Sequence, residues 1–245
     1  GTNVSLEWLQ AAYKLINTLD PHHPILITNY GLRGIQAYYS ACDILMPDCY
    51  PVFLAKGGTR YPISNLRKWT ETARALRPTW MVPQFFDWDG VSPVVDPARA
   101  PTFDELRNNV WQSLAAGARG IVGFHYTWDG RGYAMALRHG PDYLAREIAA
   151  LQPALYGDPQ PDGVVATPAP PDPTFSSTLL KFGSDELLIA VNNSYETRHV
   201  RFALKSTNAG TLHVVGENRS VTLVDQTFED AFQPTATHLY TTRED

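Results

Sequence analysis

The stretch LDPHHPILITN at residues 19–29 ends a helical pattern and begins a strand. A helix is expected before it, and its apolar side chains recur on one face at helical spacing: Leu6, Leu9, Ala12, Tyr13 and Ile16. Asp20-Pro21 stops that helix. The apolar run at residues 24–29 lies between turn residues, so it predicts a strand buried on both faces, as in a parallel sheet.

The same alternation of helix and strand continues toward the C-terminus. Strands are expected at residues 43–48, 78–86 and 120–126, a short helix or turn at 34–40, and helices at 63–76, 102–116 and 141–151. Thr102 followed by Glu105 forms a capping box at the start of one of these helices. Four strands that are each coupled to a helix indicate βα units and a parallel sheet.

These four units amount to half of a common closed fold. A complete (β/α)8 barrel takes about 250 residues, whereas residues 1–157 hold only four units. Half a barrel alone would leave two open strand edges and an apolar sheet face in water. We therefore expect residues 1–157 to be the last four units of a barrel, with the first four upstream in a removed segment or on another chain.

The composition changes after the last expected helix. Residues 158–177 are rich in proline among Gly, Asp and Ala, which predicts a linker or an extended strap. Residues 178–245 hold only short β runs with turn clusters between them, and this even spacing predicts a small antiparallel β-sandwich. The β runs lie at residues 178–182, 187–192, 199–204, 211–215, 220–224 and 237–241.

Composition and motifs exclude several functional classes. The net charge is −5 with no Lys/Arg cluster, which argues against a nucleic-acid partner. No run of about 18 apolar residues is present, so no membrane span is predicted. The chain lacks HExxH, CxxC, P-loop and GxSxG patterns. We therefore predict no metal site and no cofactor.

Two signals bear on the cellular compartment, and they disagree. Cys42 and Cys49 flank one expected strand, too far apart for a disulfide, so they are predicted to be free buried thiols, which argues weakly against an oxidising compartment. Three N-x-[ST] sequons begin at Asn3, Asn192 and Asn218, and glycosylation of any of them would mean secretion from a eukaryote. An extracellular or secreted protein is the expectation, with unmodified asparagines as the alternative.

Candidate functional side chains follow each expected strand. In a (β/α)8 barrel the active site lies at the C-terminal ends of the strands. Sugars present C–H faces that pack on aromatic rings, and hydroxyls that need hydrogen-bond partners. Alternatively, the rings cap the core and the acids are solvated in loops. The candidates after the four strands are Asn29; Asp48 and Tyr50; Gln84, Asp87, Trp88 and Asp89; and His125, Tyr126, Trp128 and Asp129.

Several stretches together resemble one enzyme group. Residues 19–24 (LDPHHP), 42–51, 78–85 and 114–126 are similar to the fifth to eighth strand regions of retaining glycosidases in the large barrel clan that includes β-galactosidases. Residues 232–240 look like the last strands of a glycosidase C-terminal β-sandwich. The resemblance covers most of the chain. It implies a (β/α)8 barrel with a C-terminal sandwich and a carbohydrate substrate.

The resemblance also raises a question about catalysis. In that clan the acid/base Glu follows the fourth strand, which would lie upstream of Gly1, and the nucleophile Glu ends the seventh strand, where this chain has Gln84. Gln cannot form the glycosyl-enzyme ester of a retaining mechanism. Either Asp48, Asp87 or Asp89 serves instead, or the alignment is off by a few residues, or the site binds sugar without cleaving it.

The sequence therefore predicts a glycoside hydrolase acting on an oligo- or polysaccharide through carboxylate acid/base catalysis. Asp48 is favoured because it directly follows an apolar strand, with Asp87 as the second charged participant and Gln84 contacting the sugar. The expected partners are the carbohydrate and an N-terminal half-barrel segment or chain. The alternative is a non-catalytic carbohydrate-binding or structural subunit on a degenerate barrel.

Overall fold

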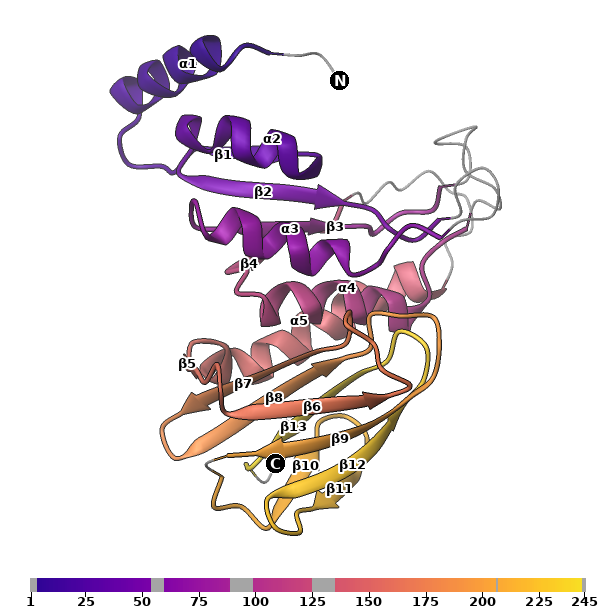
Figure 1. The fold of residues 1–245 in the computed structure, drawn as a ribbon. Coiled ribbons are helices and arrows are strands. Elements are labelled where there is room, and N and C mark those ends of the chain that lie inside the picture. The colour runs from indigo at the N-terminus through magenta and orange to yellow at the C-terminus, as the bar shows by residue number, and fades with distance from the viewer. Residues whose placement is uncertain (1–3, 54–59, 89–98, 125–134, 206, 244–245) are drawn as a thin grey trace.

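The computed structural model describes residues 4–53, 60–88, 99–124, 135–205 and 207–243, with only the backbone of 135 and 136. A four-stranded sheet with its helices lies at one end of the molecule and a β-sandwich at the other, with α4 and α5 between them (Figure 1). The helical part is built from α1 (Leu6–Leu19), β1 (Leu26–Asn29), α2 (Gly31–Tyr38), η1 (Tyr39–Ala41), β2 (Ile44–Cys49), α3 (Asn65–Arg74), β3 (Trp80–Pro83), α4 (Phe103–Ala115), β4 (Gly120–Ile121) and α5 (Met135–Leu155).

The first sheet is parallel throughout, in the order β1-β2-β3-β4. Its outer face packs on α2 and α3 through one apolar cluster, which includes Leu45, Cys49, Leu66 and Met81. Cys42 and Cys49 are free and buried in that cluster, as predicted. The strands and helices are those of half a (β/α)8 barrel, as the sequence predicts.

Helix α4 begins and ends where its sequence requires. The Thr102 side chain accepts a hydrogen bond from the Glu105 backbone, and the Glu105 carboxylate accepts one from the Thr102 backbone, so the predicted capping box is present. The helix ends before Gly117, whose φ of +95° suits glycine far better than any other residue. Within the described residues, no helix combines the length and apolarity needed to cross a bilayer.

The sandwich consists of two antiparallel sheets, in the orders β11-β10-β13-β8-β7-β5 and β12-β9-β6. Its strands are β5 (Asp158–Pro159), β6 (Val164–Ala169), β7 (Ser176–Phe182), β8 (Asp185–Val191), β9 (Arg198–Leu204), β10 (Thr211–Val214), β11 (Arg219–Thr222), β12 (Thr227–Phe232) and β13 (Thr237–Thr241).

Strand β8 is buried on both faces, which explains its nearly continuous apolar sequence. Leu188 and Ala190 point into the core between the two sheets. Leu187, Ile189 and Val191 point the other way, into a second core with Trp111 of α4 and residues of α5. The sandwich is therefore packed directly against the barrel helices, and β8, like β7 and β13, contributes side chains to both cores.

The linker prediction for residues 158–177 is wrong over much of its length. Strand β6 pairs along its full length with β9, and β5 pairs with β7. Strand β6 is an edge strand, where proline costs little because one side of the backbone needs no partner. Strand β12 was also not anticipated, because its charged residues interrupt the apolar pattern.

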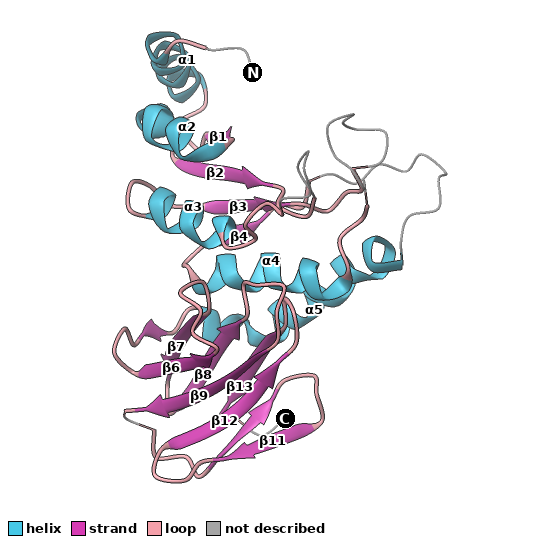
Figure 2. Ribbon diagram, turned by 45° about the vertical axis from the view of Figure 1, so that its right-hand side comes forward, coloured by secondary structure: helices cyan, strands magenta, loops and turns pink. Residues whose placement is uncertain are grey.

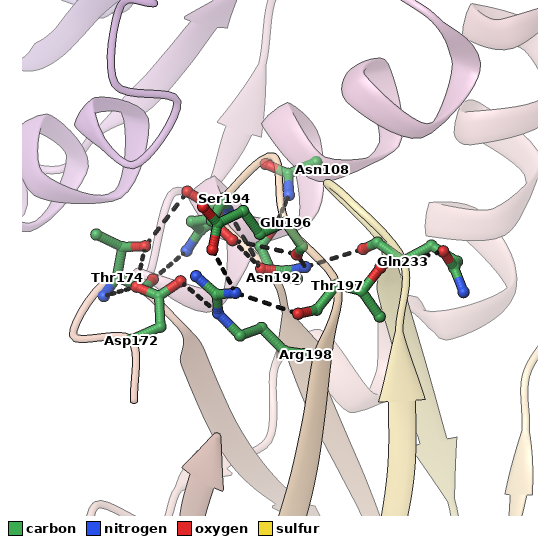
Figure 3. Close-up of polar contacts among 10 residues, drawn as sticks. Asn108, Asp172, Thr174, Asn192, Ser194, Glu196, Thr197, Arg198 and Gln233 are labelled. Atoms are coloured by element: carbon green, nitrogen blue, oxygen red, sulfur yellow. Dashed lines mark hydrogen bonds and ion pairs between the residues drawn. The ribbon is translucent and has the colours of Figure 1, made fainter. Parts of the chain in front are cut away.

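A polar cluster fixes one end of the sandwich to the half-barrel (Figure 3). Asn108 of α4 donates to the backbone oxygens of Asn192 (3.0 Å) and Thr235 (3.1 Å). The Asn192 amide in turn donates to backbone oxygens of Glu196 and Gln233. Because these groups are buried and mutually satisfied, the loops around residues 192–198 and 233–236 are held in one arrangement against α4.

The apolar face predicted for α1 is partly buried: Leu6, Leu9, Ala12 and Tyr13 are half-buried, and Ile16 is exposed. No residue of α1 is fully buried, and on an adjacent side of the helix the Trp8, Leu15 and Leu19 side chains are 63%, 59% and 77% exposed. Polar contacts also fix the helix, such as the Tyr13 hydroxyl donating to Asp43 (2.6 Å).

Candidate functional site

The carboxyl ends of the four parallel strands lie on one side of the sheet (Figure 2). Side chains that follow different strands are thereby brought together, which is the general position of active sites in barrels of this type. Among the predicted residues, Asp48, Tyr50 and Trp88 are brought together here. Asp89, His125, Tyr126, Trp128 and Asp129 lie outside the described residues.

Asp48 lies within β2 beside Val82 of β3, on the sheet face opposite the buried Leu45 and Cys49. One of its carboxylate oxygens, Oδ1, is buried and has no hydrogen-bond partner among the described residues. The other, Oδ2, accepts a long hydrogen bond from the Tyr50 hydroxyl (3.4 Å). Burial raises the pKa of Asp48 to about 6, because removing water disfavours the charged form. Asp48 is therefore a carboxyl group that can hold or release a proton near neutral pH.

An aromatic cluster from three strand ends adjoins Asp48 through Tyr50. The Tyr50 ring stacks on Phe124 at 5.3 Å and contacts Phe86 edge-on at 5.1 Å. Trp88 contacts Phe86 at 4.8 Å and Phe53 at 5.6 Å. The indole Nε1 of Trp88 is buried without a partner among the described residues. The cluster thus combines apolar ring surface with an unsatisfied donor on Trp88 and an unsatisfied acceptor on Asp48.

Gln84 does not have the role that the sequence predicted for it. Its side chain is fully buried, and its amide is used by the backbone of two neighbouring loops. Oε1 accepts from the Val52 N–H (3.0 Å), while Nε2 donates to the carbonyl oxygens of Phe86 (3.2 Å) and Val52 (3.4 Å). A sugar contact would require these bonds to break. Gln84 instead holds the loop after β2 against the loop after β3.

Asn29, predicted to bind substrate, does not face the carboxyl-end aromatic cluster. It is only 6% exposed, and its side chain lies close to Gly34 of α2, where a Cβ at Gly34 would meet Asn29 Oδ1 at 3.2 Å. The side chain thus lies on the helix-covered side of the sheet. The sequence pattern could not show this, because a residue at the end of a strand can face either side.

Asp87 directly precedes Trp88 in the segment after β3, and its side chain is half-buried. Its charge contributes to raising the pKa of Arg99, after the dominant hydrogen bond from Arg99 to Glu105. Asp87 therefore belongs to a charged group that also contains Arg99 and Glu105. Arg99 binds both oxygens of Glu105, at 2.7 and 2.6 Å.

The sandwich contributes a further residue, Tyr195, beside this charged group, and the sequence did not reveal it. Tyr195, in the loop between β8 and β9, lies under the guanidinium of Arg60, which is 4.1 Å from its ring centroid. Burial, followed by the charge of Glu105, raises the pKa of Tyr195. A residue of the sandwich therefore meets residues that follow β2 and β3. Tyr195 is 135 positions from Arg60 in the sequence, so no local pattern signals the contact.

Comparisons with known proteins test the fold. No protein-family model and no curated protein matches the chain. Solved structures do match. An α-amylase from Geobacillus thermoleovorans in complex with acarbose matches 99% of this chain with a TM-score of 0.60 and 12% identity. A putative α-galactosidase/melibiase from Bacteroides fragilis matches 98% with a TM-score of 0.61 and 10% identity.

The chain has the fold of part of a glycoside hydrolase. A GH30 endoxylanase from Clostridium papyrosolvens also matches 96% of it, with a TM-score of 0.51 and 12% identity. The chain spans 58%, 52% and 59% of the lengths of these three enzymes. This coverage agrees with half a barrel followed by a β domain. At such low identity the similarity shows the fold and does not identify catalytic residues.

Proposed function

We propose that this chain forms one side of a carbohydrate-binding and carbohydrate-hydrolysing cleft at the carboxyl ends of β1 to β4. The observation that carries the proposal is Asp48, whose buried Oδ1 is unsatisfied and whose neighbour Tyr50 belongs to an aromatic cluster with Phe86, Trp88 and Phe124. Aromatic faces suit the C–H surfaces of a sugar ring, and the unsatisfied polar atoms suit its hydroxyl groups.

Asp48 would act as the proton donor to the glycosidic oxygen. A general acid needs a pKa near the working pH, and burial raises the pKa of Asp48 to about 6. Glycoside hydrolysis requires a second carboxylate across the scissile bond. Asp87 lies after the neighbouring strand, and the other half of the barrel could also supply this group.

A binding measurement tests the aromatic part of the cleft. Trp88→Ala in the full-length protein should weaken binding of a recognised oligosaccharide about 10- to 100-fold, the range for losing a central aromatic contact. Isothermal titration calorimetry with maltohexaose, xylohexaose and melibiose as probes measures this effect. Tyr156→Ala is the matched control, because Tyr156 is an exposed ring at the end of α5. Equal affinity of wild type and Trp88→Ala would remove Trp88 from the cleft.

A non-catalytic carbohydrate-binding subunit is the second candidate. It is favoured by Gln84, which occupies the strand end where the resembling glycosidases carry their nucleophile and which is fully used by the backbone. Such a protein would bind an oligosaccharide probe through Trp88 and release no reducing sugar. The two candidates therefore differ in turnover and agree in binding.

Export from a eukaryotic cell is also part of the proposal, and two sequons allow a test. Asn192 is fully buried and its amide donates two hydrogen bonds, whereas Asn218 is exposed at the turn between β10 and β11. Expression in a eukaryotic secretory host should give a glycan on Asn218 and none on Asn192. Glycopeptide mass spectrometry measures both sites. A glycan on Asn192 of folded protein would contradict the buried cluster of Figure 3.

A further inference from the structure

Arg60, on the segment between β2 and α3, is an exposed cation. Its guanidinium lies 4.1 Å from the ring centroid of Tyr195. Among the described residues, Arg60 makes no hydrogen bond and no ion pair. The N–H donors of a guanidinium lie at the edge of its plane, so stacking on a ring leaves them available. Arg60 therefore offers an unused pair of charged donors.

Tyr195 is fixed by the sandwich and is neutral. Its loop between β8 and β9 is held against α4, because Asn108 donates to the Asn192 backbone oxygen at 3.0 Å (Figure 3). Burial, followed by the charge of Glu105, raises the pKa of Tyr195, so its phenol keeps its proton. The negative face of the neutral ring attracts the guanidinium of Arg60 and orients it.

The acidic side chains beside Tyr195 are engaged elsewhere. Glu105 is only 2% exposed, and its two oxygens accept hydrogen bonds from Arg99 at 2.7 and 2.6 Å. The charge of Asp87 also acts on Arg99, where it adds to the dominant hydrogen bond with Glu105 in raising the Arg99 pKa. Neither acid serves as the counterion of Arg60, so a charged partner for Arg60 is to be sought in a ligand.

Arg60 also lies beside the aromatic cluster of the candidate site. The next residue, Tyr61, stacks on Phe53 at 5.2 Å, and Phe53 contacts Trp88 at 5.6 Å. A series of rings thus leads from Trp88 to the neighbour of Arg60. A sugar chain that packs on Trp88 and extends along these rings brings its substituents toward the free guanidinium.

We propose that Arg60 binds the carboxylate of a uronic acid residue, so that the chain recognises an acidic oligo- or polysaccharide. The planar guanidinium matches a carboxylate through two parallel hydrogen bonds. Because stacking on Tyr195 already orients Arg60, less side-chain freedom is lost when the carboxylate binds. This inference rests on the proposed function, in which the rings around Trp88 hold the sugar chain.

Isothermal titration calorimetry of the full-length protein tests the proposal with probes that differ only in charge. The pairs are tetragalacturonate and glucuronic-acid-substituted xylotetraose, each beside its methyl ester. The acid of at least one pair should bind about tenfold or more tighter than its ester, the contribution of a hydrogen-bonded charged pair. Arg60→Gln should reduce this preference to less than about twofold.

Two further variants separate an oriented site from a simple surface charge. Tyr195→Leu removes the ring and should reduce the preference about two- to fivefold, the contribution of an exposed cation–π contact. Arg201→Gln is the matched control, because Arg201 is an exposed arginine on β9, and it should leave the preference unchanged.

Equal affinity of the wild type for acid and ester in both pairs would overturn the inference. A preference that persists in Arg60→Gln, or that Arg201→Gln abolishes as well, would also overturn it. Binding and turnover of neutral oligosaccharides without any preference would leave the proposed function intact. Conversely, an Arg60-dependent preference in a protein without turnover would refute the proposed hydrolysis and leave the carboxylate site standing.

Discussion

Replacing Glu147 by leucine should lower the free energy of unfolding by about 3–5 kcal/mol, the cost of leaving a buried charge unpaired. Glu147 of α5 is 7% exposed and accepts hydrogen bonds from Arg107 (2.8 Å) and from the Trp111 indole (2.6 Å). Arg107 also contacts the backbone oxygen of Thr237 in β13. The carboxylate therefore joins α4, α5 and the sandwich, and its loss leaves the Arg107 guanidinium without its counterion.

Thermal and urea denaturation of the full-length protein measure this effect. The matched control is Asp142→Asn, because Asp142 pairs with Arg146 one turn apart on the surface of the same helix. That exposed pair should contribute less than about 1 kcal/mol. Equal losses in the two variants would show that the Arg107–Glu147 pair does not hold the sandwich to the half-barrel.

Replacing Asp48 by asparagine should lower the rate of glycoside hydrolysis about 10²- to 10⁴-fold, the usual contribution of a general acid. The side chain keeps its shape, so oligosaccharide binding should change little. In the proposed role Asp48 acts in its protonated form, and burial raises its pKa to about 6, so wild-type turnover should fall as pH rises through 6. The variant's residual activity should lack this decline. Full-length protein assayed between pH 4 and 8 provides both readouts.

The stability of the same variant gives a check that does not need a substrate. The pKa of Asp48 is raised in the folded state, so wild type loses stability as pH rises from about 4 to about 6. Asp48→Asn should therefore equal wild type near pH 4 and exceed it above pH 6. After allowance for the partial exposure of Asp48, the gain is about 1–2 kcal/mol. A variant that is less stable than wild type at pH 7 would contradict the assigned environment of Asp48.

Much of the fold could be predicted because local pattern and final environment agree. The parallel strands are short apolar runs that helices bury on one face, and Thr102 with Glu105 forms the predicted cap. The burial on both faces predicted for residues 24–29 was wrong for the described residues, because Leu26 and Thr28 of β1 are exposed. Predictions were wrong where tertiary contacts decide. Strand β6 contains proline, and apolar and polar residues alternate only weakly along it. Only its pairing with β9 therefore distinguishes it from a linker. The apolar face of α1 correctly indicated a helix, and in the structure this face is half-buried.

The candidate site was predicted in part. Asp48, Tyr50 and Trp88 meet because the ends of parallel strands share one side of the sheet, and the sequence predicts that arrangement. The surroundings of Gln84 and Asn29 were not predictable, because the Gln84 amide is bonded to loop backbone and the Asn29 side chain lies against α2. The contact between Tyr195 and Arg60 depends on how the sandwich packs against α4, and no short-range signal encodes it.

The most direct test of the account is the release of reducing sugar by the full-length protein from starch, xylan and galacto-oligosaccharides, measured beside Asp48→Asn. The account predicts turnover on at least one substrate, with a loss of 10²-fold or more in the variant. Turnover that Asp48→Asn leaves unchanged would contradict the assignment of the cleft. Binding through Trp88 without any turnover would instead identify the chain as part of a non-catalytic carbohydrate-binding protein.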